Sequence, residues 1–243
     1  MTESPEELLA RLVASPDYPY PKGIVSEMIR RSGEMTSAML AVLEDAVTYP
    51  EKYTGEDGLW KSLTFSAYLL AQRRETRAFK PLCATLNLTG ETSDSLWGDM
   101  ITEDMGNALC SVYDGDDAPL RAIMSNPEAY EFIRGAAVPR TYQCLLKHGK
   151  IRLEELKSYT AWLLEHGLER SPSHAWDGWV NLCAEHGFAD LLPLMEKAYS
   201  EGLCDPGFAR PEEIFELATS GGDAHWSRNT DLIDDVISQT HPR

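Results

Sequence analysis

The sequence predicts an all-α protein, an α-solenoid built from HEAT-like antiparallel helix pairs in a single domain. A four-residue frame occurs four times, and its small second residue falls at Ala71, Cys110, Cys144 and Cys183, with spacings of 39, 34 and 39 residues. Three frames are followed nine or ten residues later by Pro-Leu. Apolar residues recur at helical spacing, and no run alternates as a strand would. A period of about 34 to 47 residues made of helix pairs is typical of α-solenoids.

The first 52 residues are expected to form capping helices. Ser4 and Pro5 precede two glutamates, a pattern typical of a helix start. Prolines then interrupt the chain, residues 22–31 carry a second apolar stripe that Gly33 is expected to end, and residues 36–47 carry a third. Terminal repeats are usually atypical because they cap the stack.

Residues 53–203 are expected to form the repeat array, because four helix pairs follow one another there. The predicted pairs are 59–72 with 77–86, 101–112 with 118–124, 131–147 with 153–165, and 174–185 with 189–200. Pro139 lies inside one of these helices, where its missing amide and its ring predict a kink.

The helical pattern weakens in residues 204–243, which are expected to hold a turn, short helices and a flexible tail. Residues 204–207 predict the turn and residues 210–218 a short helix. Residues 220–222, Ser-Gly-Gly, predict a flexible joint. Residues 232–237 are expected to form a last helix that docks or frays.

Composition and charge exclude several classes of function. The 243 residues carry a net charge of −17, which repels phosphate, so neither nucleic acid nor an anionic membrane is an expected partner. No apolar stretch approaches the roughly 18 to 20 residues of a membrane span, and the acidic start is unlike a secretory signal. Five well-separated cysteines predict reduced core thiols and a cytoplasmic location.

Several motifs carry a resemblance to a known family. They are Trp97 to Gly106 continuing through Ser111 to Asp116, with weaker matches at residues 67–72, 77–79, 201–203 and 205–208. Together they cover roughly residues 20–210, and the chain resembles the uncharacterised bacterial family known as domain of unknown function 1186. The resemblance implies an all-helical, HEAT-like cytoplasmic protein and implies no activity. Some members carry a cysteine-rich metal-binding tail motif, and this chain lacks it because no cysteine follows Cys204.

An acidic block lies in the second repeat. Residues 91–131 contain ten acidic residues against one basic residue. Asp99 and Glu103 share a helix face at i, i+4, with Thr102 alongside and Asp104 adjacent. A solvated face with helix capping, a patch that binds a basic protein, and a metal or catalytic site remain alternatives. The sequence from Asp114 to Asp117 lacks the twelfth-position acid of a calcium loop, so it predicts a turn between helices.

Two tryptophans and two basic clusters complete the candidate features. Trp176 and Trp179 lie three residues apart, as core packing or as an aromatic anchor for a partner. The basic clusters are expected to pair within the molecule or to give its surface two poles. They comprise Arg73, Arg74, Arg77 and Lys80, and Arg140, Lys147, Lys150 and Arg152. The candidate partner-binding residues are Asp99, Thr102, Glu103, Asp104, Tyr113, Asp114, Trp176 and Trp179.

These observations favour a non-enzymatic scaffold or adaptor that binds another protein, and the acidic block suits a partner with a basic surface. No sequence motif for a nucleophile, a phosphate loop, a zinc site or a dinucleotide site occurs, so no catalytic residue, cofactor or metal ligand is predicted. One alternative is an immunity, antitoxin or inhibitor protein that neutralises a basic toxin or nuclease. A second is an enzyme with an acidic, metal-assisted site in the second repeat. The oligomeric state stays open.

Overall fold

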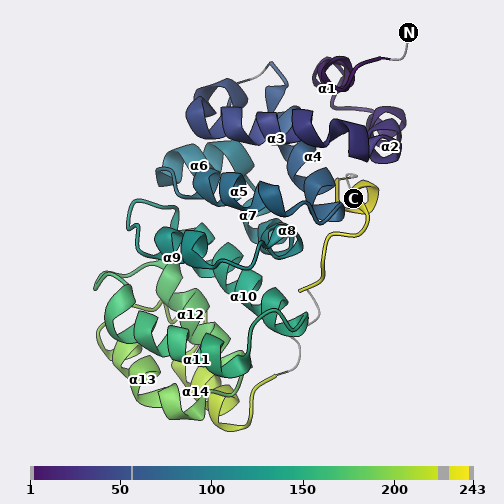
Figure 1. Cartoon of the computed structure of the whole chain (residues 1–243). Coiled ribbons are helices and arrows are strands. Elements are labelled where there is room, and N and C mark those ends of the chain that lie inside the picture. Colours follow the sequence, from purple (N-terminus) through teal and green to yellow (C-terminus); the bar gives the residue numbers. More distant parts are fainter. Residues whose placement is uncertain (1–2, 56, 224–229, 241–243) are drawn as a thin grey trace.

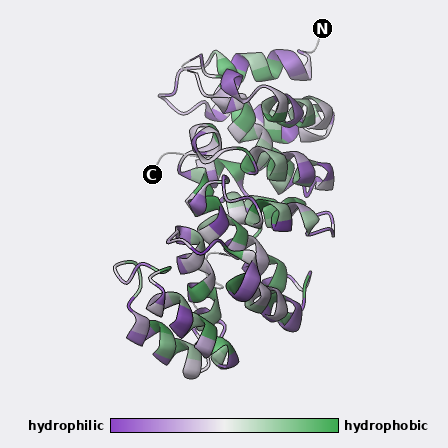
Figure 2. Ribbon diagram, turned by 90° about the vertical axis from the view of Figure 1, so that its left-hand side faces the viewer, coloured by the Kyte–Doolittle hydropathy of each residue, from purple (hydrophilic) through white to green (hydrophobic). Residues whose placement is uncertain are grey.

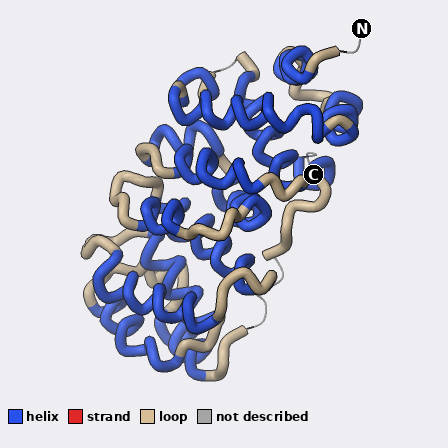
Figure 3. The backbone as a smooth tube through the Cα atoms, viewed as in Figure 1, coloured by secondary structure: helices blue, strands red, loops and turns tan. Residues whose placement is uncertain are grey.

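The computed structural model describes residues 3–55, 57–223 and 230–240, and every regular element in these ranges is a helix (Figure 3). Up to residue 219 the helices follow one another in chain order from one end of the molecule to the other, and the last described segment returns toward the starting end (Figure 1). Hydrophobic and hydrophilic residues are mixed along the helices (Figure 2), as expected where one stripe faces a neighbour and another faces solvent.

The amino-terminal end contains α1 (Pro5–Val13), α2 (Lys22–Arg30) and α3 (Ser32–Thr48). Ser4 caps α1 as predicted, because the Glu7 amide donates to its hydroxyl at 3.1 Å and its own amide donates to the Glu7 carboxylate at 2.7 Å. The predicted break at Gly33 is wrong. The chain turns two residues earlier, at Arg31 (φ −101°, ψ 13°), and Gly33 lies in the first turn of α3.

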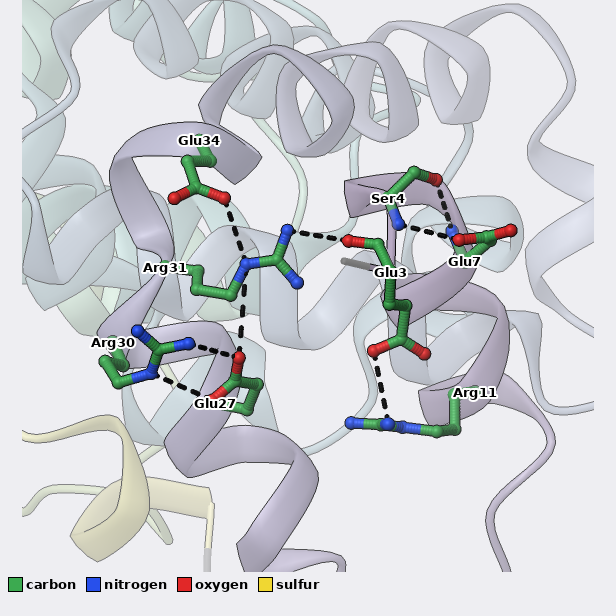
Figure 4. Close-up of polar contacts among 8 residues, drawn as sticks. All are labelled: Glu3, Ser4, Glu7, Arg11, Glu27, Arg30, Arg31 and Glu34. Carbon is green, nitrogen blue, oxygen red and sulfur yellow. Dashed lines mark hydrogen bonds and ion pairs between the residues drawn. The ribbon is translucent and has the colours of Figure 1, made fainter. Parts of the chain in front are cut away.

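Arg31 explains where this turn falls. Its side chain is only 6% exposed, its Nε lies 3.0 Å from Glu34, and its Nη2 donates to the Glu3 carbonyl at 2.8 Å (Figure 4). Glu27 lies 4.0 Å from the same Nε, and its carboxylate also accepts a hydrogen bond from Arg30 Nε (Figure 4). One buried guanidinium thereby joins the start of α1 to the corner between α2 and α3.

The predicted helix pairs are present, with some irregular ends. They are α4 (Leu59–Gln72) with α5 (Phe79–Leu86), α7 (Met100–Glu103) and α8 (Met105–Val112) with α9 (Ala118–Met124), α10 (Val138–Lys147) with α11 (Leu153–Trp162), and α12 (His174–Glu185) with α13 (Leu192–Ser200). Short 3₁₀ turns at Pro50–Tyr53, Thr76–Ala78 and Ala189–Leu191 lead into or join helices. The predicted single helix over 101–112 is divided at Asp104 into α7 and α8.

The helix α6 (Gly90–Trp97) was not predicted. Its sequence is mostly polar, with no apolar stripe before Leu96 and Trp97. Hydrogen bonds to one residue of α5 hold it instead: Ser93 donates to the Thr85 carbonyl at 3.0 Å, and Trp97 Nε1 donates to the Thr85 hydroxyl at 3.1 Å. Such long-range polar contacts leave no periodic signal in the sequence.

The first helices of successive pairs contact one another, from α4 to α8 and from α8 to α10, and α12 then contacts α14 (Pro211–Thr219). On the other side, α3 contacts α5 and α5 contacts α9. The small residues of the repeated frame, Ala71, Cys110, Cys144 and Cys183, are all buried. They therefore lie in the core, as predicted for the cysteines among them.

The predicted distortion near Pro139 takes the form of a π-helical segment, Ile133–Ala137, directly before α10. The Val138 amide donates to the Ile133 carbonyl, five residues back. In this register the next donor is Pro139, which has no amide hydrogen for the Arg134 carbonyl. Trp179 supplies the missing donor from α12, because its Nε1 donates to that carbonyl at 3.1 Å. A second π-helical segment, Leu163–Gly167, follows α11.

The predicted flexible joint at residues 220–222 is instead closely packed. Gly221 and Gly222 have φ angles of +99° and +83°, and the Asp223 amide donates to the Glu185 carbonyl at 2.9 Å. A Cβ on Gly222 would lie 2.3 Å from that carbonyl oxygen. Glycine is therefore required here by a tight corner against the end of α12, which the sequence pattern cannot distinguish from a mobile linker.

All five cysteines are buried and free of disulfides, as the sequence predicts. Among the described residues, none of the helices combines the length and the apolar character that crossing a membrane requires.

Candidate interaction face

The carboxy-terminal segment, residues 230–240, lies against the first helices of the array. It includes the short helix α15 (Val236–Thr240) and runs from the level of α10 past α8 and α4 to α2 (the yellow loop and helix at the right of Figure 1). Ile233 and Val236 are fully buried. The part of the predicted flexible tail that the structure describes is therefore docked, and residues 224–229 and 241–243 lie outside the described residues.

Two side chains of the array receive the backbone amides of this segment. The Ile233 amide donates to the Ser111 hydroxyl at 2.9 Å, and the Val236 amide donates to the Gln72 side-chain oxygen at 3.0 Å. Ser111 and Gln72 occupy the same position of the repeated frame, one residue after Cys110 and Ala71. Neighbouring helices pack about 8 to 10 Å apart, and three extended residues span at most about 10 to 11 Å. These two repeats therefore match two residues three positions apart in a bound chain.

Three further contacts fix the direction and the charge of the segment. Arg74 donates to the Ile233 carbonyl at 2.6 Å and forms an ion pair with Asp234. Lys147 lies 2.6 Å from Asp231. At the far end, the Tyr20 and Thr240 hydroxyls are 2.6 Å apart. We call the surface formed by Tyr20, Gln72, Arg74, Ser111 and Lys147 the tail-binding face.

Arg74 adopts a backbone conformation that ordinarily favours glycine. Its φ is +58°, the only positive value among the described non-glycine residues. It follows the cap residue of α4, and the Glu75 amide donates back to the Leu70 carbonyl at 3.0 Å, which is the Schellman pattern. At the corresponding position after α10 and α12, the chain has Gly149 and Gly187, each with φ +65°. An arginine here costs backbone strain of roughly 1 kcal/mol or more, and it aims a guanidinium at the bound segment.

The two basic clusters predicted from the sequence do pair within the molecule. Arg74 and Lys147 bind the carboxy-terminal segment, as described above. Arg77 pairs with Glu75 at 2.8 Å, and Arg152 pairs with Glu155 at 2.8 Å. The clusters therefore serve both the tail-binding face and local ion pairs.

Of the acidic candidates, only Asp104 reaches the tail-binding region. It is half-buried and accepts a hydrogen bond from Tyr68 at 2.9 Å. Burial, followed by the charge of Asp104, raises the pKa of the Tyr68 phenol well above its usual value. When the Gln239 amide is oriented to donate, its nitrogen lies 3.2 and 3.1 Å from the two Asp104 carboxylate oxygens. Asp104 thus connects α4 with the carboxy-terminal segment.

The other acidic candidates lie on the exposed surface. Asp99 and Asp104 directly precede α7 and α8, where negative charge is favoured. Neither side chain accepts a hydrogen bond from a helix amide, so the predicted side-chain capping is absent. Thr102 and Glu103 are exposed as well. Within the described ranges, no lysine or arginine lies within 4.0 Å of the Asp99 or Glu103 carboxylate.

Asp114 and Tyr113 have local partners. The Asp114 side chain accepts the Asp116 amide at 3.0 Å, which forms the predicted turn, and it lies 3.9 Å from Lys80. The Tyr113 ring is half-buried and meets Phe79 edge-on, with centroids 5.3 Å apart. Asp114 and Asp104 therefore engage different partners. Across the residues that the structure describes, no group of three or more His, Cys, Asp or Glu side chains is placed to hold a metal ion.

Trp176 and Trp179 belong to the core. They are 1% and 0% exposed, and their indole nitrogens donate to the Glu169 and Arg134 carbonyls. Buried indoles offer no surface to a partner. Both tryptophans therefore pack in the core, which is one of the two alternatives that the sequence allows, and the prediction that they contact a partner is wrong. Trp162, by contrast, is 47% exposed and stacks on Tyr159.

A cavity of about 610 Å³ lies beside the amino-terminal end of α12. The His174 ring is packed between Phe132 and Phe208, and its Nδ1 lies 3.6 Å from Asp177. Asp177 is 9% exposed and accepts the Asp205 amide at 2.8 Å. This histidine–carboxylate pair therefore ties the turn at 203–208 to α12. That turn contains one of the family-like motifs, which supports a structural role for those residues.

The structure thus defines an all-helical protein whose own carboxy-terminal segment lies across the first helices of successive pairs. The chain belongs to the family described as "Protein of unknown function (DUF1186)", whose model matches residues 4–241. It is 29% identical to an uncharacterised protein of Chlamydia trachomatis serovar D and 28% identical to one of Chlamydia muridarum. Each match covers 90% of this chain and 88% of the relative. No solved structure gives a significant match.

Sequence reasoning did not identify the tail-binding face, although two signals for it are present. Gln72 and Ser111 are polar residues beside the buried small residue of the frame, where Leu145 and Ala184 occupy the next two repeats. Arg74 takes the cap position that is glycine after two later helices. Neither signal indicates a binding face by itself, because its meaning depends on the carboxy-terminal segment that lies against these residues.

Proposed function

We propose that this chain is a non-enzymatic, cytoplasmic protein-binding module, a HEAT-like solenoid that holds an extended segment of another protein on its tail-binding face. The observation that carries the proposal is the repeat-matched pair of hydrogen bonds from Ser111 and Gln72 to amides three residues apart. Side chains that bind backbone atoms of an extended chain recognise peptides irrespective of most of their sequence, and nearby side-chain sites add specificity.

The charges and packing around this contact support a binding role. Arg74 holds a strained backbone conformation while it contacts the segment, and local strain of this kind is concentrated at functional positions. The fully buried Ile233 and Val236 show that the face accepts apolar side chains. Solenoids commonly bind partners along such extended surfaces.

A second candidate function follows from the exposed acids. Asp99, Thr102 and Glu103 are exposed, and among the described residues neither carboxylate forms an ion pair, although Arg140 donates a hydrogen bond to the Glu103 carbonyl. The whole chain has a net charge of −17. This surface suits a basic partner, such as a toxin or nuclease that the chain would inhibit. Charge of this kind mainly accelerates encounter, so its signature is an association rate that falls with salt.

Site-specific photo-crosslinking in cells tests the proposal and separates the two candidates. A photoreactive residue at position 147 lies on the tail-binding face, one at position 103 lies on the exposed acidic surface, and one at position 197 on α13 serves as the control. We expect position 147 to capture a defined protein that is absent from the control. After identification by mass spectrometry, that protein is purified and titrated against Gln72→Ala.

Because Gln72 also binds the chain's own segment, the titration uses a chain in which Ile233→Asp/Val236→Asp has released that segment. On this background we expect Gln72→Ala to weaken partner binding about fivefold to tenfold, because one hydrogen bond is worth about 1 kcal/mol. Capture only at position 103 would favour the inhibitor role. Unchanged affinity in Gln72→Ala would contradict recognition through the tail-binding face.

A further inference from the structure

We infer that the carboxy-terminal segment is a built-in competitor, and that the partner segment it excludes is extended and acidic, with two apolar residues three positions apart. This inference rests on the proposed function and adds to it the chemistry of the partner and a means of control.

The chemistry of the partner is taken from the segment that already fits. Asp231 pairs with Lys147 and Asp234 pairs with Arg74. The side chains of Ile233 and Val236 are fully buried. The amides of Ile233 and Val236 are both bound by the array. A chain that offers carboxylates and apolar side chains at the same spacing would make the same contacts. A basic chain would bring its cations against Arg74 and Lys147.

The segment also has the properties of a displaceable ligand rather than of one more repeat. Its first half has no regular secondary structure, and α15 is only five residues long. Its polar contacts go to side chains, namely Ser111, Gln72 and Arg74. The helix-to-helix contacts from α4 to α8 and from α8 to α10 do not involve it. The array can therefore keep its fold when the segment leaves.

Attachment to the same chain sets the strength of the competition. A tethered segment acts at an effective concentration on the order of 1 mM. For a peptide that binds the free face with a Kd of about 100 µM, this tether would keep the face occupied about 90% of the time. The apparent affinity of a second, separate peptide would then be reduced about tenfold.

The test uses the full chain and a fluorescent peptide of residues 230–240. In the variant Ile233→Asp/Val236→Asp, two carboxylates replace the buried side chains, so the tethered segment is released. By fluorescence anisotropy, we expect this variant to bind the peptide at least about tenfold more tightly than the wild type does. Val236→Asp alone provides the same comparison if circular dichroism shows that the double variant has lost helix.

Adding Arg74→Gly to the released variant tests whether peptide binding depends on Arg74. Glycine relieves the positive φ at position 74, so the fold should be retained or stabilised while the contacts with Ile233 and Asp234 disappear. We expect peptide affinity to fall at least about fivefold. A peptide with its three aspartates changed to asparagine should lose a similar factor, since the ion pairs of Asp231 with Lys147 and of Asp234 with Arg74 are then absent.

Each contrary result removes a stated part of the inference. Equal binding by wild type and released variant, or no binding by either, would overturn the competitor role. Equal binding of the asparagine peptide would overturn the acidic chemistry. All three results leave the crosslinking test of the proposed function intact, because that test depends on a captured protein and not on this peptide.

Discussion

Replacing Gly178 with alanine should destabilise the protein by about 3 kcal/mol or more. A Cβ on Gly178 would lie 1.8 Å from the Gly135 carbonyl oxygen, and a Cβ on Gly135 would lie 2.1 Å from the His174 carbonyl oxygen. Both obstacles are backbone atoms, so α12 and the π-helical segment Ile133–Ala137 must move apart. Overpacking commonly costs 1 to 3 kcal/mol and sometimes more.

Thermal unfolding followed by circular dichroism measures this effect. For a chain of this size each kcal/mol corresponds to about 2 to 4 °C, so we expect the Tm of Gly178→Ala to fall by roughly 10 °C. Gly23→Ala is the matched control, because Gly23 lies in α2 with no atom within 4 Å of the added Cβ. It should be neutral or slightly stabilising. Equal Tm values for the two variants would show that the helices do not approach so closely.

Replacing Arg134 with methionine should cost about 3 to 5 kcal/mol. The Arg134 side chain is 2% exposed, its Nη1 donates to Glu169 at 2.8 Å, and its Nη2 donates to the Met124 carbonyl at 3.3 Å. Removing the cation leaves a partly buried carboxylate and a carbonyl without their donor, which is the costly way to break a buried pair. Urea unfolding measures the change.

Arg152→Met is the control for this prediction. Its ion pair with Glu155 is exposed, and such pairs contribute little, so we expect a change within about 0.5 kcal/mol. If the two arginine variants were equally stable, the buried pair would not contribute as the structure indicates.

The Arg134–Glu169 pair also predicts a pH dependence. Burial acts to raise the pKa of the Glu169 carboxyl. The hydrogen bonds from Arg134 and from the Glu169 amide, together with the charge of Arg134, outweigh burial and hold that pKa below its usual value of 4.5. The stabilisation is therefore complete above the unfolded-state pKa and is lost as pH falls through the lower folded-state pKa. The difference in unfolding free energy between wild type and Arg134→Met should narrow as pH is lowered from 7 to below 4.5.

The sequence could predict the helices and their order because both depend on local patterns. α4, α9 and α12 begin and end as predicted, and the small residues of the frame are buried where helices meet. The Pro139 distortion was predictable because proline lacks an amide. The Arg134 carbonyl, left without a backbone donor, instead accepts a hydrogen bond from Trp179, 45 residues further along the chain. This contact depends on packing that periodicity does not encode.

The candidate site was less accessible to sequence reasoning. The acidic residues were found by their density, but their partners depend on tertiary contacts: Asp104 meets Tyr68 and Asp114 lies near Lys80. The sequence allows Trp176 and Trp179 either a core or a surface position, because helical spacing alone does not tell which stripe is buried. The tail-binding face joins residues more than 120 positions apart, Ser111 and Ile233, so no local pattern reveals it.

Amide hydrogen exchange at Ile233 and Val236 tests the central claim most directly. With both amides bound by Ser111 and Gln72, we expect them to be protected in the wild type and to exchange faster when excess 230–240 peptide is added. Amides within α4 and α8 should stay protected throughout, since the helices do not depend on the segment. Exchange at Ile233 and Val236 as fast as in an unstructured peptide, or unchanged by the competitor, would contradict the account.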